Sequence, residues 1–270
     1  MKLSIPGRIF RAFIILVTGL YLLGPLYGML DFSTKPLGLE GGRTLRAWTA
    51  IGDNPDVASS LIASFSIAIV VMLLVFLLVV PTVIWVHLKL PAFRRPMELI
   101  CLLPLAIPAI VIVVGIAPLY RWISINVTES SVTLSGVYAM LILPYTYRSL
   151  SAALDLVDVA TLAEAARTLG ASTMRTIFGV VMPTIRSGIM SGVVISLALV
   201  LGEFTISALL AFDTLQVVIY LLGRQDGKIA VAVALSALLF VFAILFAIPT
   251  TKRQRVILEE PPRLSDASFH

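Results

Sequence analysis

Very few side chains in this 270-residue sequence could do chemistry, and two glutamates stand out among them. Glu203 interrupts an apolar run as part of Leu-Gly-Glu-Phe. A carboxylate in such a run usually faces a partner, water or the interior of a helix bundle. It could therefore line a pathway for a solute, or form a structural hydrogen bond to a neighbouring helix. Glu164 lies instead in a polar stretch, Thr161–Pro183, which could bind a partner.

The histidines and the cysteine do not form a catalytic pattern. His87 ends an apolar run, His270 is the last residue, and Cys101 is the single cysteine. Catalysis at membrane depth needs a nucleophile with a base, or a set of metal ligands. Cys101 is expected to be a small buried hydrophobic residue. We expect neither catalytic residues nor a metal site, and the sequence lacks the Gly-x-x-x-x-Gly-Lys-Ser/Thr loop that would bind ATP phosphates.

These few polar residues are embedded in a very apolar chain. Hydrophobic residues make up 59% and charged residues 13% of it, whereas soluble proteins carry about 25% charged residues. This composition predicts an all-α membrane protein. A spanning helix needs about 20 apolar residues, and the uncharged runs predict six transmembrane helices, at Ala12–Leu30, Val57–Val86, Leu99–Tyr120, Ser130–Tyr147, Ser187–Gly202 and Ile229–Thr251. The fourth run is short and opens with polar residues.

Basic residues are distributed unevenly between the two predicted sides of the membrane. Most of the 20 Lys and Arg residues fall on the side that holds both termini and Thr161–Pro183. The positive-inside rule places that side in the cytoplasm. The predicted organisation is a membrane domain over residues 1–251 and a charged cytoplasmic tail over residues 252–270. The net charge of +5 fits loops that face an anionic lipid leaflet, and we expect no nucleic-acid partner.

Proline and small residues mark special places in the predicted helices. Proline removes a backbone hydrogen bond and can bend a helix. Pro104 and Pro108, both in the predicted third span, could shape the packing of the bundle or form a hinge that faces a pathway. Gly188, Ser191 and Gly192 predict a close helix contact at the start of the fifth span.

Thr161–Pro183 begins with the pattern of a short amphipathic helix. Thr161 and Glu164 have the spacing of a capping box, in which each side chain binds the backbone amide of the other residue. Gly170 predicts the end of this helix, because glycine readily adopts the left-handed conformation found there. An apolar stripe is predicted at Leu162, Ala165, Ala166 and Leu169.

A second short helix is predicted to follow. Ser172 or Thr173 can cap its first turn, and Pro183 is predicted to close it. One face is predicted to carry Met174, Ile177, Phe178 and Val181. Such a helix pair could rest on the membrane interface or dock in a groove of a soluble partner; reading DNA is disfavoured, because membrane segments flank it closely.

The same stretch resembles the EAA loop of binding-protein-dependent ABC importer permeases. That loop reads Glu-Ala-Ala, three residues, Gly, nine residues and Ile-x-Leu-Pro, and the matching positions are Glu164, Ala165, Ala166, Gly170, Val180, Met182 and Pro183. Val180 and Met182 are conservative departures. Six spans, with the loop between the fourth and the fifth, are similar to the type I importer fold. Ser64–Ala68 weakly resembles the Asn-Ser-Leu segment of the family.

This resemblance implies a permease subunit that does not itself hydrolyse ATP. In such permeases the EAA loop forms a coupling helix in a cleft of an ABC ATPase dimer, which binds ATP and Mg, so Glu164 and Gly170 are the expected coupling residues. The resemblance also implies a second permease subunit, expected to complete a heterodimer, and an extracytoplasmic substrate-binding protein. The expected location is the bacterial cytoplasmic membrane, with no cofactor held by this chain.

The cargo is indicated less clearly than the family. Leu-Gly-Glu-Phe resembles a stretch found in importers for molybdate, sulfate, iron, phosphonate and polyamines, so it does not specify one solute. The predicted third to sixth spans are most similar to the spermidine/putrescine branch, which favours a polyamine. Iron, thiamine, phosphonate or an oxyanion are alternatives. The rival classes are an intramembrane enzyme and a secondary transporter, which usually contains inverted repeats.

Overall fold

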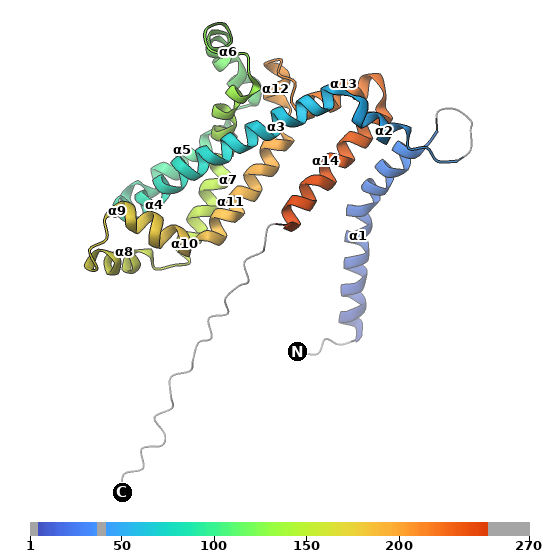
Figure 1. The fold of residues 1–270 in the computed structure, drawn as a ribbon. Coiled ribbons are helices and arrows are strands. Elements are labelled where there is room, and N and C mark those ends of the chain that lie inside the picture. The colour runs from blue at the N-terminus through green and yellow to red at the C-terminus, as the bar shows by residue number, and fades with distance from the viewer. Residues whose placement is uncertain (1–4, 37–41, 248–270) are drawn as a thin grey trace.

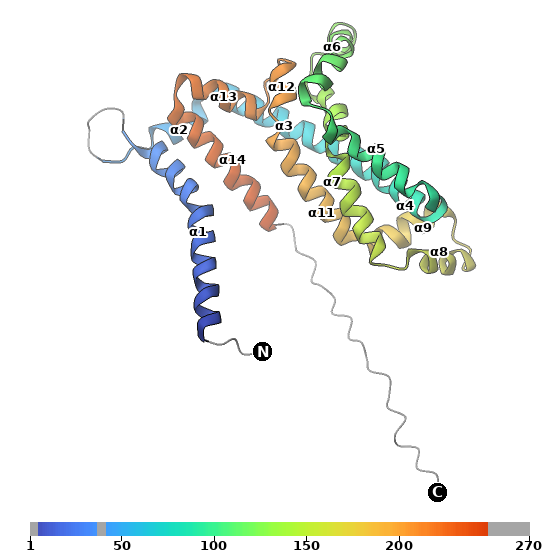
Figure 2. The same cartoon turned by 180° about the vertical axis from the view of Figure 1, so that it is seen from behind.

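A computed structural model describes residues 5–36 and 42–247, and every regular element within them is helical (Figures 1 and 2). The predicted tail, residues 252–270, lies outside these ranges. Five helices in the described part are long and apolar enough to cross a membrane, at Ile9–Thr34, Pro55–Lys89, Ala109–Asn126, Arg186–Leu209 and Gly227–Ile244. The chain is thus an all-α protein with the helices of a multi-pass membrane protein.

The first half of the chain contains α1 (Ile5–Thr34), α2 (Arg46–Asp53), α3 (Pro55–Leu74), η1 (Val75–Val79), α4 (Val80–Lys89), η2 (Pro91–Phe93), α5 (Arg94–Ala106) and α6 (Ala109–Asn126). The second half contains η3 (Ser131–Leu134), α7 (Ser135–Asp155), α8 (Val159–Thr168), α9 (Thr173–Thr176), η4 (Ile177–Val181), α10 (Met182–Thr184), α11 (Arg186–Gly202), α12 (Thr205–Leu209), α13 (Leu215–Gln225) and α14 (Gly227–Ala247).

The predicted third span is not one helix, which corrects the prediction for Leu99–Tyr120. Helix α5 ends at Ala106, and Ile107 and Pro108 have extended backbone with ψ of 122° and 139° before α6 begins. Pro108 cannot donate a hydrogen bond, and a residue before proline avoids helical geometry, so the break falls between the two. Pro104 remains inside α5 and is buried. The predicted fourth span corresponds to η3 and α7, which is not among the five apolar helices.

Two other prolines each follow a widened helical turn. The π-helical turn η1 ends two residues before Pro81, and the π-helical turn η4 ends two residues before Pro183. In a regular α-helix the proline ring collides with the carbonyl four residues earlier. A π turn adds a residue and moves that carbonyl. The helices therefore continue past both prolines.

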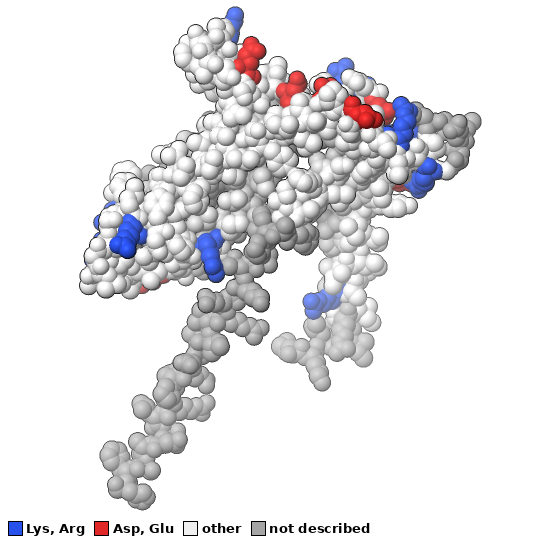
Figure 3. Space-filling model, viewed as in Figure 1, with Lys and Arg blue, Asp and Glu red and all other residues white. Residues whose placement is uncertain are grey.

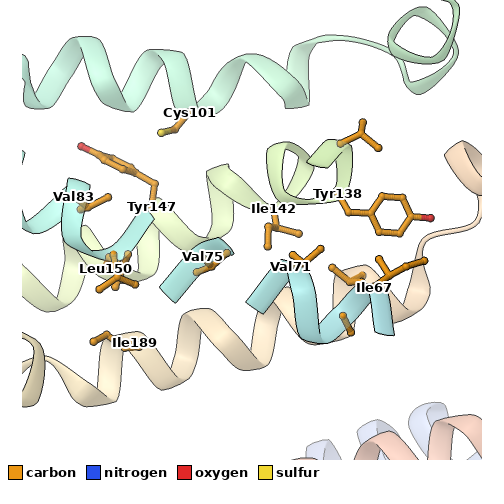
Figure 4. Packing of buried hydrophobic residues seen from close by; sticks show 14 of the residues in the cluster. Ile67, Val71, Val75, Val83, Cys101, Tyr138, Ile142, Tyr147, Leu150 and Ile189 are labelled. Carbon is orange, nitrogen blue, oxygen red and sulfur yellow. The ribbon is translucent and has the colours of Figure 1, made fainter. Parts of the chain in front are cut away.

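Helix α7 lies at the centre of the main apolar core, between α5, α11 and the continuous helix α3–η1–α4 (Figures 1 and 4). Tyr138 and Ile142 of α7 are almost fully buried beside Ile67 and Val71 of α3, whereas Leu150 is buried farther along α7, near Val83 of α4 (Figure 4). Apolar side chains from four helices thus meet along the length of α7. Because these contacts hold both flanks of the segment that follows α7, the core fixes where that segment is presented.

The closest helix approach joins α7 and α11. A Cβ atom built on Gly188 would lie 2.2 Å from Cβ of Ala153 and 3.2 Å from the carbonyl oxygen of Ser149, so only glycine fits there. The Ser149 hydroxyl donates to the Gly188 carbonyl at 2.9 Å. Gly192 also packs against Ser149. The predicted close contact of the fifth span is confirmed at both glycines, and its partner is α7.

A smaller apolar cluster joins α13 and α14 to the start of α3. Ser64 of α3 is buried, and its hydroxyl accepts a hydrogen bond of 2.9 Å from the amide of Leu215, the first residue of α13. This bond satisfies an amide that has no partner within its own helix. Helix α1 packs on α14 and α2, yet none of its most apolar stretch is buried. A bilayer or another subunit is needed to cover it.

Candidate coupling segment and the Glu203 cluster

Helix α8 begins earlier than the capping box predicts, which corrects the role of Thr161. The N-cap is Asp158, whose carboxylate accepts from the Thr161 amide at 3.2 Å and from the Thr161 hydroxyl at 2.6 Å. These two hydrogen bonds hold the pKa of Asp158 below its ordinary value, the hydroxyl contributing most. Glu164 therefore lies in the second turn, with an exposed side chain.

The end of α8 is closed as Gly170 predicts. Gly170 has a φ of 81°, in the left-handed region. Its amide donates to the carbonyl of Arg167 at 2.8 Å, and the amide of Ala171 donates to the carbonyl of Ala166 at 3.0 Å. This pair of bonds is the Schellman arrangement, which satisfies the last carbonyls of a helix. The prediction of a glycine stop is confirmed.

The second helix is capped by Ser172, as predicted. The Ser172 hydroxyl accepts from the amide of Arg175 at 3.3 Å, and α9, η4 and α10 then form one continuous helix. Pro183 does not close it directly, because the helix runs on to Thr184 and turns at Ile185. The Thr184 hydroxyl donates to the carbonyl of Val180 at 2.7 Å. Both caps and the turn between them are therefore built from local bonds.

The predicted apolar faces of the two helices are divided between the protein and solvent, which corrects both stripes. In α8, Ala163 and Ala166 face inward, whereas Ala165 and Leu169 are exposed. In the second helix the predicted face likewise splits, with Ile177 and Val181 buried and Met174 and Phe178 exposed. The inward residues pack α8 and η4 on each other and on α4.

We use the name elbow face for the following exposed residues: Leu156, Glu164, Ala165, Arg167, Leu169, Gly170, Met174, Arg175 and Phe178. Leu156 and Leu169 are each 88% exposed, which is unusual for a large apolar side chain. The elbow, by which we mean the segment from α8 to α10, lies at the end of the molecule opposite α2 and α13 (Figures 1 and 2). Exposed apolar groups rimmed by charges mark sites of interaction with other proteins. The capped helix pair thus presents a partly apolar surface at this end of the molecule.

Charges differ between the two ends of the molecule. On the face shown in Figure 3, acidic side chains gather along the edge formed by α2, α3 and α12. Basic side chains also lie along that edge, whereas the end that carries α9 and α10 shows mainly basic side chains on this face.

Glu203 lies in a break of the chain rather than in the middle of a helix. It follows the last residue of α11 with extended backbone, φ −75° and ψ 126°. Its carboxylate accepts from the amide of Ile206, at 3.0 Å and 3.3 Å from the two oxygens, and thereby caps the short helix α12. The hydroxyl of Tyr138, on α7, donates to Oε2 of Glu203 at 2.7 Å. Glu203 therefore makes the structural hydrogen bond to a neighbouring helix that was one of its two predicted roles.

Three buried residues around Glu203 were not predicted from the sequence: Tyr138, Ser207 and Thr214. The Tyr138 hydroxyl lies 3.0 Å from Oγ of Ser207, and the Thr214 hydroxyl donates to the same Oγ at 2.9 Å. All three residues are buried. Ser207 stands four residues after Glu203, a spacing that could have suggested contact across one helical turn. Tyr138 is 65 residues away, and no local pattern marks it.

The two candidate pathway prolines lie in different surroundings. Pro104 is buried in α5, which packs on α7, whereas the exposed Pro108 begins α6, which packs on α12. A separate hollow of about 660 Å³ opens between α3, α11, α13 and α14. Its lining includes Gly202 but not Glu203, and its two polar side chains, Gln216 and Ser236, already donate to backbone carbonyls.

No group of three or more His, Cys, Asp or Glu residues in the described part of the chain could hold a metal ion. The search against models of protein families finds no match to this chain, and a comparison with curated proteins finds no relative. The elbow and the Glu203 cluster are therefore interpreted from their own geometry and from the motif that the elbow carries.

Proposed function

We propose that this chain is the transmembrane permease subunit of an ATP-driven ABC importer with a type I fold. The observation that carries the proposal is the elbow, which combines the Glu-Ala-Ala and Gly170 spacing with an exposed, doubly capped helix pair. A coupling element must move as a unit when its partner moves. The caps at Asp158, Gly170 and Ser172 supply that rigidity, and the exposed Leu169 supplies an apolar contact for an ATPase cleft.

Helix α7 is proposed to be a further span beside the five apolar helices. It corresponds to the fourth of the six spans in chain order. It has 21 residues, and at 1.5 Å per residue such a helix is about 31 Å long, close to the thickness of the hydrocarbon layer. Its polar side chains make hydrogen bonds to other helices, as with Thr146 and Ser196 at 3.0 Å, so low hydropathy does not require exposure to water. A central span covered by other helices needs fewer apolar residues than one that faces lipid.

In this scheme both termini and the elbow face the cytoplasm of a bacterial cell, and α2 and α13 face outward toward a substrate-binding protein. An ATPase dimer docks on the elbow face, and a second permease subunit completes the pathway. Closure of the ATPases would shift the two-state equilibrium of the permease between inward-facing and outward-facing forms. The proposed cargo is a polyamine; iron, thiamine, phosphonate or an oxyanion would be carried by the same arrangement.

The proposal predicts that an ATPase purifies with the tagged chain from its native membrane. It also predicts that the activity of this ATPase depends on the elbow. Gly170→Arg should lower cargo-stimulated ATP hydrolysis at least tenfold, since arginine is strained at a φ of 81° and reshapes the exposed turn. Glu164→Ala should lower it less. Gly136→Ala, at a position with open space around it, is the control.

Each variant must first be shown to reach the membrane in the same amount as the parent chain. Unchanged stimulation in a normally assembled Gly170→Arg complex would contradict the proposal. The cargo is identified separately, by measuring whether the partner binding protein binds spermidine, putrescine or one of the alternative solutes.

A further inference from the structure

We propose that Tyr138 is a positioning residue that latches α12 to the α7–α11 helix pair. The latch consists of Tyr138, Glu203, Ser207 and Thr214. It lies at the end of α11 that is remote from the elbow (Figure 1). The latch rests on contacts alone and does not depend on the importer function proposed above.

The hydrogen bonds of the latch converge on one carboxylate. A phenol has a single proton, and a carboxylate is a stronger acceptor than a hydroxyl. Tyr138 therefore donates to Glu203 at 2.7 Å, and its oxygen can accept from Ser207 at 3.0 Å. Thr214, just before α13, donates to Ser207 at 2.9 Å. One tyrosine hydroxyl thus joins α7 to the residue that caps α12 and to Ser207 within α12.

The turn that follows α12 has an unfavourable backbone conformation. Ala211, two residues after the helix, has a φ of 60°, which is uncommon for a residue with a side chain. The amide of Phe212 donates to the Ser207 carbonyl at 2.9 Å across this turn. Backbone strain of this kind persists only where surrounding contacts maintain it. The latch provides such contacts at the other end of the same five-residue helix.

Helices α7 and α11 connect the latch to the elbow. They flank the elbow directly, since α7 ends at Asp155 and α11 begins at Arg186. Hydrogen bonds join them at three levels: Ser149 to Gly188 near the elbow, Thr146 to Ser196 in the middle, and Tyr138 to Glu203 at the far end. Two helices joined in this way are expected to move together. A displacement of the elbow would then reach the α12 segment through the latch.

This arrangement favours a positional role for Glu203 over direct binding of a cationic solute. Both of its oxygens already accept hydrogen bonds, from Ile206 and Tyr138. A carboxylate used as a helix cap and latch acceptor is compatible with cargo of either charge. The positional role therefore explains why a glutamate stands at position 203, whatever the charge of the solute.

The test is hydrogen–deuterium exchange of the full-length chain in lipid nanodiscs. In Tyr138→Phe the amides of residues 204–212 should exchange about tenfold faster than in the parent chain, the factor expected for one lost buried hydrogen bond to a charged group. Thr146→Val is the matched control, because it removes one buried hydrogen bond between the same two helices at mid-depth. It should leave residues 204–212 within about twofold of the parent.

Ser207→Ala, a smaller change in the same network, should also accelerate exchange at residues 204–212. The latch is refuted if both Tyr138→Phe and Ser207→Ala leave that segment unchanged, or if Thr146→Val accelerates it equally. Because the measurement needs no ATPase, it separates the two proposals. Unchanged exchange together with an uncoupled Gly170→Arg complex would remove the latch and leave the importer function standing.

Discussion

At the scale of single residues, Asp158 caps the first turn of the elbow. Its contribution to the stability of the folded state depends on pH. Hydrogen bonds from Thr161 lower the pKa of Asp158 below the ordinary 3.8. A carboxyl with a lowered pKa stabilises the folded state fully above its ordinary pKa. That stabilisation is lost as the pH falls through the lowered value, where the protonated group no longer accepts both bonds.

We therefore predict that Asp158→Ala loosens the first turn of α8 at neutral pH. Amide exchange over residues 159–164 should rise roughly fivefold, the usual effect of losing an N-cap. Asp158→Asn should keep the protection, because asparagine caps equally well, and should abolish the loss of protection in acid. Asp155→Ala removes a nearby exposed carboxylate that is not the cap and is the control. Equal exchange in Asp158→Ala and Asp155→Ala would show that Asp158 does not hold this turn.

Local chemistry explains which residues of the elbow could be predicted. Gly170 and Ser172 each act through their own backbone neighbourhood, so their types and spacing were sufficient. The start of α8 was misplaced because Thr161 has the type of a cap, whereas Asp158, an equally good cap type, stands directly before the first helical residue. The bond from Tyr138 to Glu203 could not be predicted, since it depends on the tertiary approach of two helices.

At the scale of elements, the close approach of α7 and α11 at Gly188 gives a sharp prediction. Gly188→Ala places a methyl group 2.2 Å from Cβ of Ala153, and forced overpacking typically costs about 1–3 kcal/mol. The apparent Tm of the purified chain should fall by several degrees. Gly136→Ala, a glycine of α7 with nothing within 4 Å of the added carbon, should leave Tm unchanged or slightly raised.

A rescue variant checks the cause of that loss. Combining Gly188→Ala with Ala153→Gly moves one methyl group from α7 to α11 and should recover part of the Tm. The Ser149 carbonyl, 3.2 Å from the added carbon, limits the recovery. If the double variant is no more stable than Gly188→Ala alone, the collision between the two methyl groups is not what makes the glycine necessary.

Helical periodicity did not identify the buried face of either elbow helix, since even the regular helix α8 buries Ala163 and exposes Ala165 and Leu169. The predicted face of the second elbow helix assumed 3.6 residues per turn, but η4 is a π turn that adds a residue before Pro183. In this helix Ile177 and Val181 turn inward while Met174 and Phe178 stay exposed. In the same way, uncharged length alone joined α5 and α6 into one span, although Pro108 interrupts them.

At the scale of the whole molecule, a rigid pair of helices connects two features with different contacts. One end carries the elbow face, which is exposed, and the other carries the latch, which is buried. Composition was enough to predict an all-helical membrane protein, because apolar runs of this length have few other uses. The identity of the central helix α7 was harder to assign, since burial against protein allows hydroxyl groups that lipid would not favour.

The central claim is that the elbow face contacts an ATPase, and site-specific photo-crosslinking in native membranes tests it most directly. A benzoylphenylalanine at Leu169, which is 88% exposed at the elbow, should cross-link to a polypeptide that also binds a photoreactive ATP analogue. The same group at Tyr21, which is 79% exposed on α1, should not. A cross-link from position 169 to an ATP-binding polypeptide, absent from position 21, is the predicted result. Cross-links from position 169 to lipid alone, or to proteins that do not bind ATP, would contradict the account.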